Sequence, residues 1–223
     1  MKFSSIFFPK IIADFKSDIN KNIQVVQKRG RKVIYVDGAE QTGGTITGMW
    51  QKALSNVKSS RLSGIPQAAG QMSNVQNALV LGLGGGDIIR LLHRVDSQIK
   101  VTAVDIDPVM IKIARDLFGI RNSSNLKIHN HDALYYLLLN REKFSLIVVD
   151  LFIGYKNPQK FRSPRFLNLL QKSRQKNGLI LFNSHYHSDF NNEFEEFHNL
   201  CTQIFSTVEI IINYPYSKIL LLK

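Results

Sequence analysis

The chain has 223 residues, a hydrophobic fraction of 44% and a formal net charge of +12. This length and hydrophobic content argue against a disordered chain and suit one α/β domain with a small appendage. The one cysteine, Cys201, excludes an intramolecular disulfide and a cysteine-based zinc cluster, and it favours a reducing compartment. The excess of positive charge indicates attraction to anions such as nucleic acid or a membrane surface.

The first residues, MKFSSIFFPKIIADF, contain only a short apolar stretch that Pro9 and Lys10 interrupt. They lack the cleavage pattern of a signal peptide, and no apolar run approaches the roughly 20 residues that a membrane span needs. We therefore expect a soluble, cytoplasmic protein with no membrane partner. The expected division is an N-terminal arm and β-hairpin appendage (1–57), a linker loop (58–77) and a main domain (78–223).

The appendage is predicted from the stretch NIQVVQKRGRKVIYVDG. Its β-branched and aromatic residues alternate on both sides of Gly30, which predicts two strands joined by a tight turn at Arg29-Gly30-Arg31. Residues 1–20 predict a short helix or an irregular arm, and a helix is expected around 49–57. The segment KSSRLSGIPQAAGQMSNVQ is rich in Ser, Gly and Gln, which is typical of a linker or mobile loop.

The most informative stretch, ALVLGLGGGDIIRLLHRVDSQIKVTAVDID, starts at Ala78. It predicts a strand, a glycine-rich turn, a helix and a second strand that ends in Asp105. The bare N–H groups of such a turn attract polar or anionic groups, and an acid about 20 residues later can accept hydrogen bonds from both ribose hydroxyls. The unit predicts a nucleoside-binding site. The alternative is a structural turn that lets a helix pack closely on a strand.

From residue 78 onward, strand and helix patterns alternate without interruption. Such alternation predicts a parallel sheet with right-handed crossovers and helices on both faces. About two residues near Pro215 join the last two strands, so the final strand must run antiparallel. The predicted fold is a Rossmann-like, seven-stranded, mostly parallel sheet with an antiparallel last strand, plus the N-terminal β-hairpin. Strands are expected near 78–82, 100–105, 126–129, 144–150, 178–183, 207–213 and 216–222, and helices near 86–95, 108–118, 132–139, 162–175 and 190–205.

Two helix boundaries have their own signals. Asp107-Pro108 predicts an N-cap followed by a proline in the first turn, and Asn177-Gly178 predicts the C-cap of the fourth helix. Ligands of open α/β sheets lie beyond the carboxyl ends of the strands. That edge is expected to collect Gly84 to Asp87, Asp105, Asp132, Asp150 and the segment Asn183 to His187.

The motifs VIYVDGAEQ, LVLGLGGGD, VTAVDIDPVMIKIAR, HNHDA and LIVVDLFIG resemble those of the spermidine synthase family. That family has the fold of S-adenosylmethionine-dependent methyltransferases, and the resemblance covers roughly residues 23–183. The form GLGGG, together with DLFIG and a following proline, is most similar to the spermidine synthase-like domains that are sometimes fused to transporters. The resemblance implies S-adenosylmethionine or its decarboxylated form as the donor, no metal, and a homodimer.

The resemblance also implies which residues hold the donor's amino-acid-like tail. Gln41 matches the family glutamine that contacts this tail. Gly84, Gly85 and Asp87 match the loop beneath it, and Gly86 belongs to the same glycine cluster.

The sugar and base of the donor have their own matches. Asp105 matches the carboxylate on the ribose, with Ile106 next to it. Asp132, with the backbone of Ala133, matches the pair that reads the adenine edge.

Asp150 matches the aspartate that helps to deprotonate the attacking amine in the aminopropyltransferases. Transfer from a sulfonium needs a well-placed amine lone pair and a carboxylate that accepts the proton, which Asp150 could supply at the end of a strand. The alternative is a loop-starting aspartate that caps backbone N–H groups. Trp50 falls where the family usually places a tyrosine that lines the acceptor pocket, and Phe152 is expected there too.

The departures from the family pattern concern the acceptor. Ile153 stands where aminopropyltransferases have a second aspartate, and Ile88 replaces the last glycine of the nucleoside loop. The segment from Lys156 to Lys176 holds seven basic residues and no acid. Like charges near a cleft repel a cationic polyamine, so we expect a plain diamine to be a poor acceptor. A solvated basic face is an equally good explanation of that segment.

These observations predict a transferase that moves an aminopropyl or methyl group to an unidentified amine-type acceptor. One alternative is a non-catalytic nucleoside-binding or regulatory protein, which Ile153 motivates. Another is a nucleic acid methyltransferase, or weak nucleic acid contact through the basic surface, although DLFIG is not the Asp/Asn-Pro-Pro-aromatic motif of such enzymes. His185 and His187, with Asp189 nearby, suggest a metal site. Two histidines without a third firm ligand are more often pocket or surface residues, and we expect that here.

Overall fold

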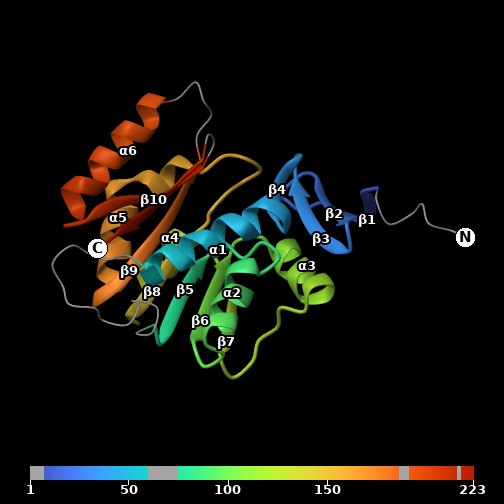
Figure 1. The fold of residues 1–223 in the computed structure, drawn as a ribbon, viewed down its shortest axis with the longest axis horizontal. Coiled ribbons are helices and arrows are strands. Elements are labelled where there is room, and N and C mark those ends of the chain that lie inside the picture. The colour runs from blue at the N-terminus through green and yellow to red at the C-terminus, as the bar shows by residue number, and fades with distance from the viewer. Residues whose placement is uncertain (1–7, 60–74, 186–190, 215–216) are drawn as a thin grey trace, which may run out of the picture.

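A seven-stranded sheet with the order β10-β11-β9-β8-β5-β6-β7 forms the centre of the fold (Figure 1). It is seen in a computed structural model that describes residues 8–59, 75–185, 191–214 and 217–223. Strands β5 to β9 pair in parallel, whereas β11 runs antiparallel to both β9 and β10. The predicted Rossmann-like sheet and its antiparallel last strand are confirmed. The strands are β5 (Asn77–Leu81), β6 (Lys100–Asp105), β7 (Leu126–Asn130), β8 (Phe144–Val149), β9 (Arg174–His185), β10 (Val208–Tyr214) and β11 (Ser217–Leu222).

Helices cover both faces of this sheet (Figure 1). Neighbouring residues of a strand point to opposite faces, so Val80 packs in the core beneath α1 and α2, while Leu79 and Leu81 pack in the core beneath α4, α5 and α6. The third helix, α3, contributes Ala114 to the first of these cores. The helices are α1 (Gly44–Ser59), α2 (Asp87–Val95), α3 (Pro108–Phe118), α4 (Ala133–Leu139), α5 (Pro164–Ser173) and α6 (Asn191–Ile204), with a short 3-10 helix, η2 (Gln159–Arg162).

The N-terminal appendage is a four-stranded antiparallel sheet in the order β1-β2-β3-β4. The predicted hairpin is β2 and β3, and its turn has Arg29 and Gly30 at positive φ. Apolar residues of these two strands pack against Met110 and Ile113 of α3, so the appendage shares a core with the main domain. The strands are β1 (Lys10–Phe15), β2 (Ile23–Lys28), β3 (Arg31–Val36) and β4 (Ala39–Thr42).

The structure corrects three boundaries. Residues 10–15 form a strand rather than a helix or an irregular arm, because backbone pairing with β2 holds an edge strand whose apolar residues Ile11 and Ile12 are exposed. Helix α1 starts at Gly44, five residues before the predicted start. Asn177-Gly178 lies inside β9 and caps no helix, because α5 already ends at Ser173. Gly178 lets β9 approach β8, since a Cβ there would lie 2.7 Å from the Phe144 carbonyl oxygen.

Most of the predicted linker, residues 60–74, lies outside the described residues. The predicted cap at Asp107 is present: its carboxylate accepts hydrogen bonds from the backbone N–H groups of Val109 and Met110, and Pro108 follows in the first turn. Among the helices of the described residues, none has the length and apolar content that a membrane span requires.

Gly82, directly after β5, shows how tightly the first turn packs on the sheet. Its φ is +95°, and an added Cβ would lie 2.0 Å from the carbonyl oxygen of Asp150. We expect Gly82→Ala to lower the free energy of unfolding by roughly 3 kcal/mol or more, because strain at positive φ adds to overpacking.

The matched control is Gly119→Ala. Gly119 also has a positive φ, +72°, but no heavy atom lies within 4 Å of a Cβ there. This variant should lose only about 1–2 kcal/mol. Equal losses in urea denaturation of the two variants would contradict the close approach of β5 and β8.

Candidate functional site

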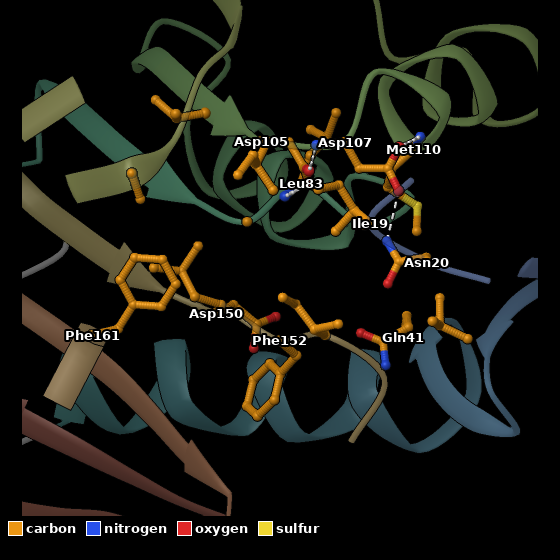
Figure 2. A pocket seen from close by; sticks show the side chains of 18 of the residues that line it. Ile19, Asn20, Gln41, Leu83, Asp105, Asp107, Met110, Asp150, Phe152 and Phe161 are labelled. Atoms are coloured by element: carbon orange, nitrogen blue, oxygen red, sulfur yellow. Dashed lines mark hydrogen bonds between the residues drawn. The ribbon is translucent and has the colours of Figure 1, made fainter. Parts of the chain in front are cut away.

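A cavity opens at the carboxyl ends of β5, β6 and β8 (Figure 2). Figure 2 shows Asp105 and Asp107 on one side of it, and Asp150, Phe152 and Gln41 on the other. The N-terminal sheet closes the cavity, since Ile19 and Asn20 of the β1–β2 connection and Gln41 of β4 line it.

Only part of the glycine turn lines the cavity. Gly82 and Gly84 line the cavity, whereas Gly85 and Gly86 pack against the protein behind the turn. The backbone N–H of Gly85 donates a 2.6 Å hydrogen bond to the Thr42 hydroxyl at the end of β4, and Gly86 precedes α2 with φ +81°. Of the four predicted glycine-loop residues, Gly84 therefore lines the cavity, whereas Gly85, Gly86 and Asp87 lie behind the turn.

Asp105, at the end of β6, has both carboxylate oxygens fixed by the backbone. One oxygen accepts a 2.9 Å hydrogen bond from the Leu83 N–H, and the other accepts a 2.9 Å hydrogen bond from the Asp107 N–H. Burial raises the pKa of Asp105 to about 6, despite these backbone hydrogen bonds, and the nearby carboxylate of Asp107 contributes to the rise. Since each oxygen has a second lone pair, the carboxylate can still accept two hydrogen bonds from a ligand in the cavity. Ile106, the next residue, also lines the cavity.

The structure corrects the placement of Asp87. Its carboxylate accepts hydrogen bonds of 2.8 Å from the Gly43 N–H and 2.5 Å from the Thr47 hydroxyl, and it forms an ion pair with Arg90. Asp87 is the first residue of α2. The turn at Gly86 directs its side chain toward the start of α1 and away from the side of the loop that lines the cavity. Asp87 thus fastens the N-terminal segment to the main domain and does not line the cavity.

Asp132 and Ala133 lie at the other end of the cavity, where α4 begins. Ala133 lines the cavity directly. One oxygen of Asp132 caps α4 by accepting from the N–H groups of Leu134 and Tyr135, and the other accepts a 2.5 Å hydrogen bond from the Lys160 ammonium. Partial burial opposes ionisation of Asp132, but the hydrogen bonds from Lys160, Tyr135 and Leu134, together with the charge of Lys160, outweigh it and lower the pKa of this acid.

Asp150, directly after β8, is oriented by two side chains, one of which is itself held by a third. One oxygen accepts a 3.0 Å hydrogen bond from the indole N–H of Trp50, and the other accepts a 2.7 Å hydrogen bond from the Asn183 amide. Ser217 in turn donates a 2.7 Å hydrogen bond to the amide oxygen of Asn183. Burial raises the pKa of Asp150 to about 6, against the lowering effect of the hydrogen bonds from Asn183 and Trp50, and the charge of Asp87 adds to the rise.

This arrangement changes the role of Trp50. It was expected to line the acceptor pocket, but its side chain is fully buried in α1 packing. Its indole instead fixes the orientation of the Asp150 carboxylate.

A second cavity, of about 580 Å³, adjoins the first and shares Gln41, Asp150 and Phe152 with it. Phe152 is thus on the wall of both cavities, as expected for a residue near the acceptor. The remaining walls are mostly apolar or aromatic, and Ile46, Met49, Tyr155 and Tyr214 are among the residues that form them. A group that enters the second cavity can meet Asp150 at the point where the cavities join.

One further acid lines the second cavity. The Glu40 carboxylate is already engaged, because it accepts a 3.1 Å hydrogen bond from the Ile46 N–H at the start of α1. Ile153, which replaces the second family aspartate, lines the first cavity and is 44% exposed. Among the described lining residues, Asp150 is therefore the acid best placed to meet an amine at the junction.

Sequence reasoning missed two polar residues of the first cavity, Asn20 and Lys160. The amide of Asn20 donates a 2.6 Å hydrogen bond to Asp107, although 87 positions separate the two residues. The arm before β2 has no periodic pattern that could have revealed this contact. Lys160 was taken as one member of the basic segment 156–176, and only the structure shows its ion pair with Asp132.

The predicted histidine cluster cannot be placed. His187 and Asp189 lie outside the described residues, and so does the side chain of His185. His131 lines the first cavity, whereas His129 packs against the ring of Tyr136.

A family model described as the spermine/spermidine synthase domain matches residues 56–216. The chain is 27% identical over 135 residues to a polyamine aminopropyltransferase of Vibrio vulnificus, a match that covers 56% of this chain and 45% of the relative. It is 28% identical over 117 residues to an eEF1A lysine and N-terminal methyltransferase homolog of Drosophila melanogaster, with 48% of this chain and 17% of the relative covered. The chain thus spans less than half the length of either curated relative.

The fold has a solved counterpart in human methyltransferase-like protein 13, whose crystal structure is in complex with SAH (S-adenosylhomocysteine). The TM-score is 0.65 at 19% sequence identity, and the match covers 81% of this chain and 82% of that chain. At this identity the likeness establishes the methyltransferase fold.

Proposed function

This chain belongs to the spermine/spermidine synthase domain family, and we propose that it transfers a methyl group from S-adenosylmethionine to a primary amine. The observation that carries the proposal is the position of Asp150, a buried carboxylate at the junction of the cavity at the strand ends and a mostly apolar second cavity. At this junction the carboxylate would lie between a donor in the first cavity and an amine in the second, where it can accept a proton from the amine.

The residues present fit an adenosine sulfonium compound in the first cavity. Asp105 keeps two lone pairs for the ribose hydroxyls, and Ala133 lines the end of the cavity where the adenine would lie. Asp132 holds that end in place, because its carboxylate binds the first N–H groups of α4 and the Lys160 ammonium. Gly84 lets the loop pack closely against the end of β4, since a Cβ there would lie 2.8 Å from the Thr42 hydroxyl. When bound, the donor supplies an electrophilic carbon on a positively charged sulfur.

The charges in the first cavity favour the carboxylated donor over the decarboxylated one. A decarboxylated tail is purely cationic and needs a free carboxylate, whereas a tail with both ammonium and carboxylate groups does not. Asp87 points away from the cavity, and all the hydrogen bonds of Asp107 go to the α3 N-terminus, Ser17 and Asn20. In the proposed reaction Asp105 binds the ribose and Asp150 takes the proton of the acceptor. None of these acids is therefore available to the cationic tail of the decarboxylated donor.

The residues of the chain perform three tasks in the proposed reaction. The mostly apolar second cavity disfavours an ammonium ion, which lowers the acceptor pKa and helps to expose its lone pair. As the N–C bond forms and the C–S bond breaks, the sulfur keeps the bonding electron pair and becomes a neutral thioether. Asp150 takes the proton that the nitrogen loses, and Trp50 and Asn183 keep its carboxylate oriented.

We propose that the acceptor amine stands at the end of an apolar stem, as in a lysine side chain. Ile46, Met49 and Tyr214 offer contact area to such a stem, and the mostly apolar wall disfavours the second ammonium of a diamine. The name of the Drosophila relative, which refers to lysine and N-terminal methylation, agrees with this class of acceptor.

The choice of donor is the direct test. In calorimetric titrations, S-adenosylmethionine should bind at least tenfold more tightly than its decarboxylated form. Gln41→Glu adds a carboxylate to the cavity wall, which loses the 2.7 Å hydrogen bond to the Gly154 carbonyl and turns toward the cavity. It should shift this preference toward the decarboxylated donor by roughly tenfold, about 1.4 kcal/mol.

Tighter binding of the decarboxylated donor, together with spermidine formation from putrescine, would instead establish aminopropyl transfer. Binding of S-adenosylmethionine without turnover of any lysine peptide or simple alkylamine would favour the non-catalytic alternative that Ile153 motivates.

A further inference from the structure

We propose that a basic groove between the β2–β3 turn and helix α2 binds the phosphate backbone of a nucleic acid. The groove consists of two adjoining hollows that share Arg90 and Arg94 of α2. It lies apart from the two cavities of the proposed transferase site, and none of its cations takes part in the transfer. Its basic residues are Arg31, Lys32, Arg90, His93, Arg94 and Arg121.

The β2–β3 turn supplies one wall of the groove. Four of its five residues, in the sequence Lys-Arg-Gly-Arg-Lys from 28 to 32, are cationic, and all of them are exposed. The positive φ angles of Arg29 and Gly30 make the turn tight, and the short turn keeps these positive charges close together. Lys32 also donates a 2.7 Å hydrogen bond to the carbonyl of Leu117, which ties the turn to the end of α3.

Helix α2 supplies the opposite wall. Arg90 and Arg94 are one helical turn apart and therefore lie on one face. Arg90 is held by Asp87 and by the carbonyl of Gly85. Within the described part of the chain, the guanidinium groups of Arg31 and Arg94 have no hydrogen bond or ion pair, so they remain available to an external anion.

The groove holds almost no negative charge to offset these cations. Asp87 is the one acid among the described residues that line it, and Gly43, Thr47 and Arg90 already bind its carboxylate. The six basic residues of the groove therefore face one acid, whose carboxylate is already bound.

Two features favour a phosphate backbone over an acidic peptide. The groove is rich in arginine, whose planar guanidinium matches the oxygens of phosphate in a bidentate way. The chain as a whole has a calculated pI of about 9.8, in the range typical of nucleic-acid-binding domains. Helix α1 separates the groove from the second cavity, since Thr47 and Gln51 face the groove while Ile46 and Met49 face the cavity.

Fluorescence anisotropy with a labelled 20-nucleotide single-stranded RNA tests the proposal. The wild-type protein should bind at 50 mM KCl, and its affinity should fall steeply as salt is raised. The double variant Arg31→Ala/Arg94→Ala should bind about tenfold more weakly, and the salt dependence of its affinity should lose about two units of slope. Its affinity for S-adenosylhomocysteine should not change, because neither residue lines the first cavity.

The matched control is Lys172→Ala/Lys176→Ala, which removes two exposed positive charges outside the groove. This variant should bind the RNA within about twofold of the wild-type protein. The proposal is overturned if the wild-type protein does not bind at 50 mM KCl, if both double variants weaken binding equally, or if polyglutamate competes as well as unlabelled RNA. None of these results would bear on methyl transfer, which the donor titrations test separately.

Discussion

Replacement of Asp105 by alanine should lower the affinity for S-adenosylhomocysteine by at least about a hundredfold, because hydrogen bonds to a charged group contribute about 1.5–3 kcal/mol each and two are lost. The carboxylate lies on the cavity wall, held by the N–H groups of Leu83 and Asp107, so the ribose hydroxyls are its remaining partners. Isothermal titration calorimetry measures the loss directly.

A pH series separates this role from simple damage to the loop. Since burial raises the pKa of Asp105 to about 6, the acid is ionised above that pH and protonated below it. A protonated carboxyl group loses acceptor capacity, so the affinity of the wild-type protein should fall by about tenfold from pH 7 to pH 5. Asp105→Asn should bind weakly and show no such dependence.

The control is Asp116→Ala, which removes an exposed acid of α3 that pairs with Arg115 far from the cavity wall. This variant should bind the ligand as the wild-type protein does. An Asp105→Ala protein that unfolds at its normal temperature and binds S-adenosylhomocysteine with unchanged affinity would mean that the nucleoside site lies elsewhere.

Replacement of Asp150 by asparagine should lower kcat for methyl transfer to a lysine peptide by about 10²- to 10⁴-fold, the usual contribution of a general base. Asparagine nearly preserves the shape of the side chain but cannot take up a proton. Affinity for S-adenosylhomocysteine should stay within about twofold, because Asp105 and the base-binding residues are untouched.

The pH dependence of the wild-type rate gives a second readout of Asp150. Burial raises its pKa to about 6, so kcat should rise about tenfold per pH unit below that value and rise less steeply above it. Ser217→Ala, which removes the hydrogen bonds to Asn183 and to the Met49 sulfur but leaves the Asp150 carboxylate in place, should lower kcat far less. If Asp150→Asn keeps a third or more of the wild-type kcat, Asp150 is not the proton acceptor.

Much of the main domain could be predicted because its signals are local. The strand before Gly82, the cap at Asp107 and the acid at the end of β6 follow from short-range patterns and fixed spacing. The turn of the β2–β3 hairpin could be predicted for the same reason, since Gly30 interrupts two alternating runs.

The direction of individual side chains in the site could not be predicted in the same way. The motif Gly-Gly-Gly-Asp places Asp87 next to the loop in sequence, but the positive φ of Gly86 decides which side of the loop its carboxylate reaches. The hydrogen bond from Trp50 to Asp150 joins residues 100 positions apart. Contacts of this kind depend on how α1 packs over the sheet, which no local pattern reports.

The central claim is that the first cavity holds an adenosine sulfonium donor with its sulfur directed toward Asp150. A crystal structure of the protein with S-adenosylhomocysteine tests it most directly. The account predicts ribose hydroxyls within hydrogen-bond distance of Asp105, the adenine beside Ala133, and the sulfur facing the junction of the two cavities. Ligand density outside the first cavity, or a ribose that does not contact Asp105, would contradict it.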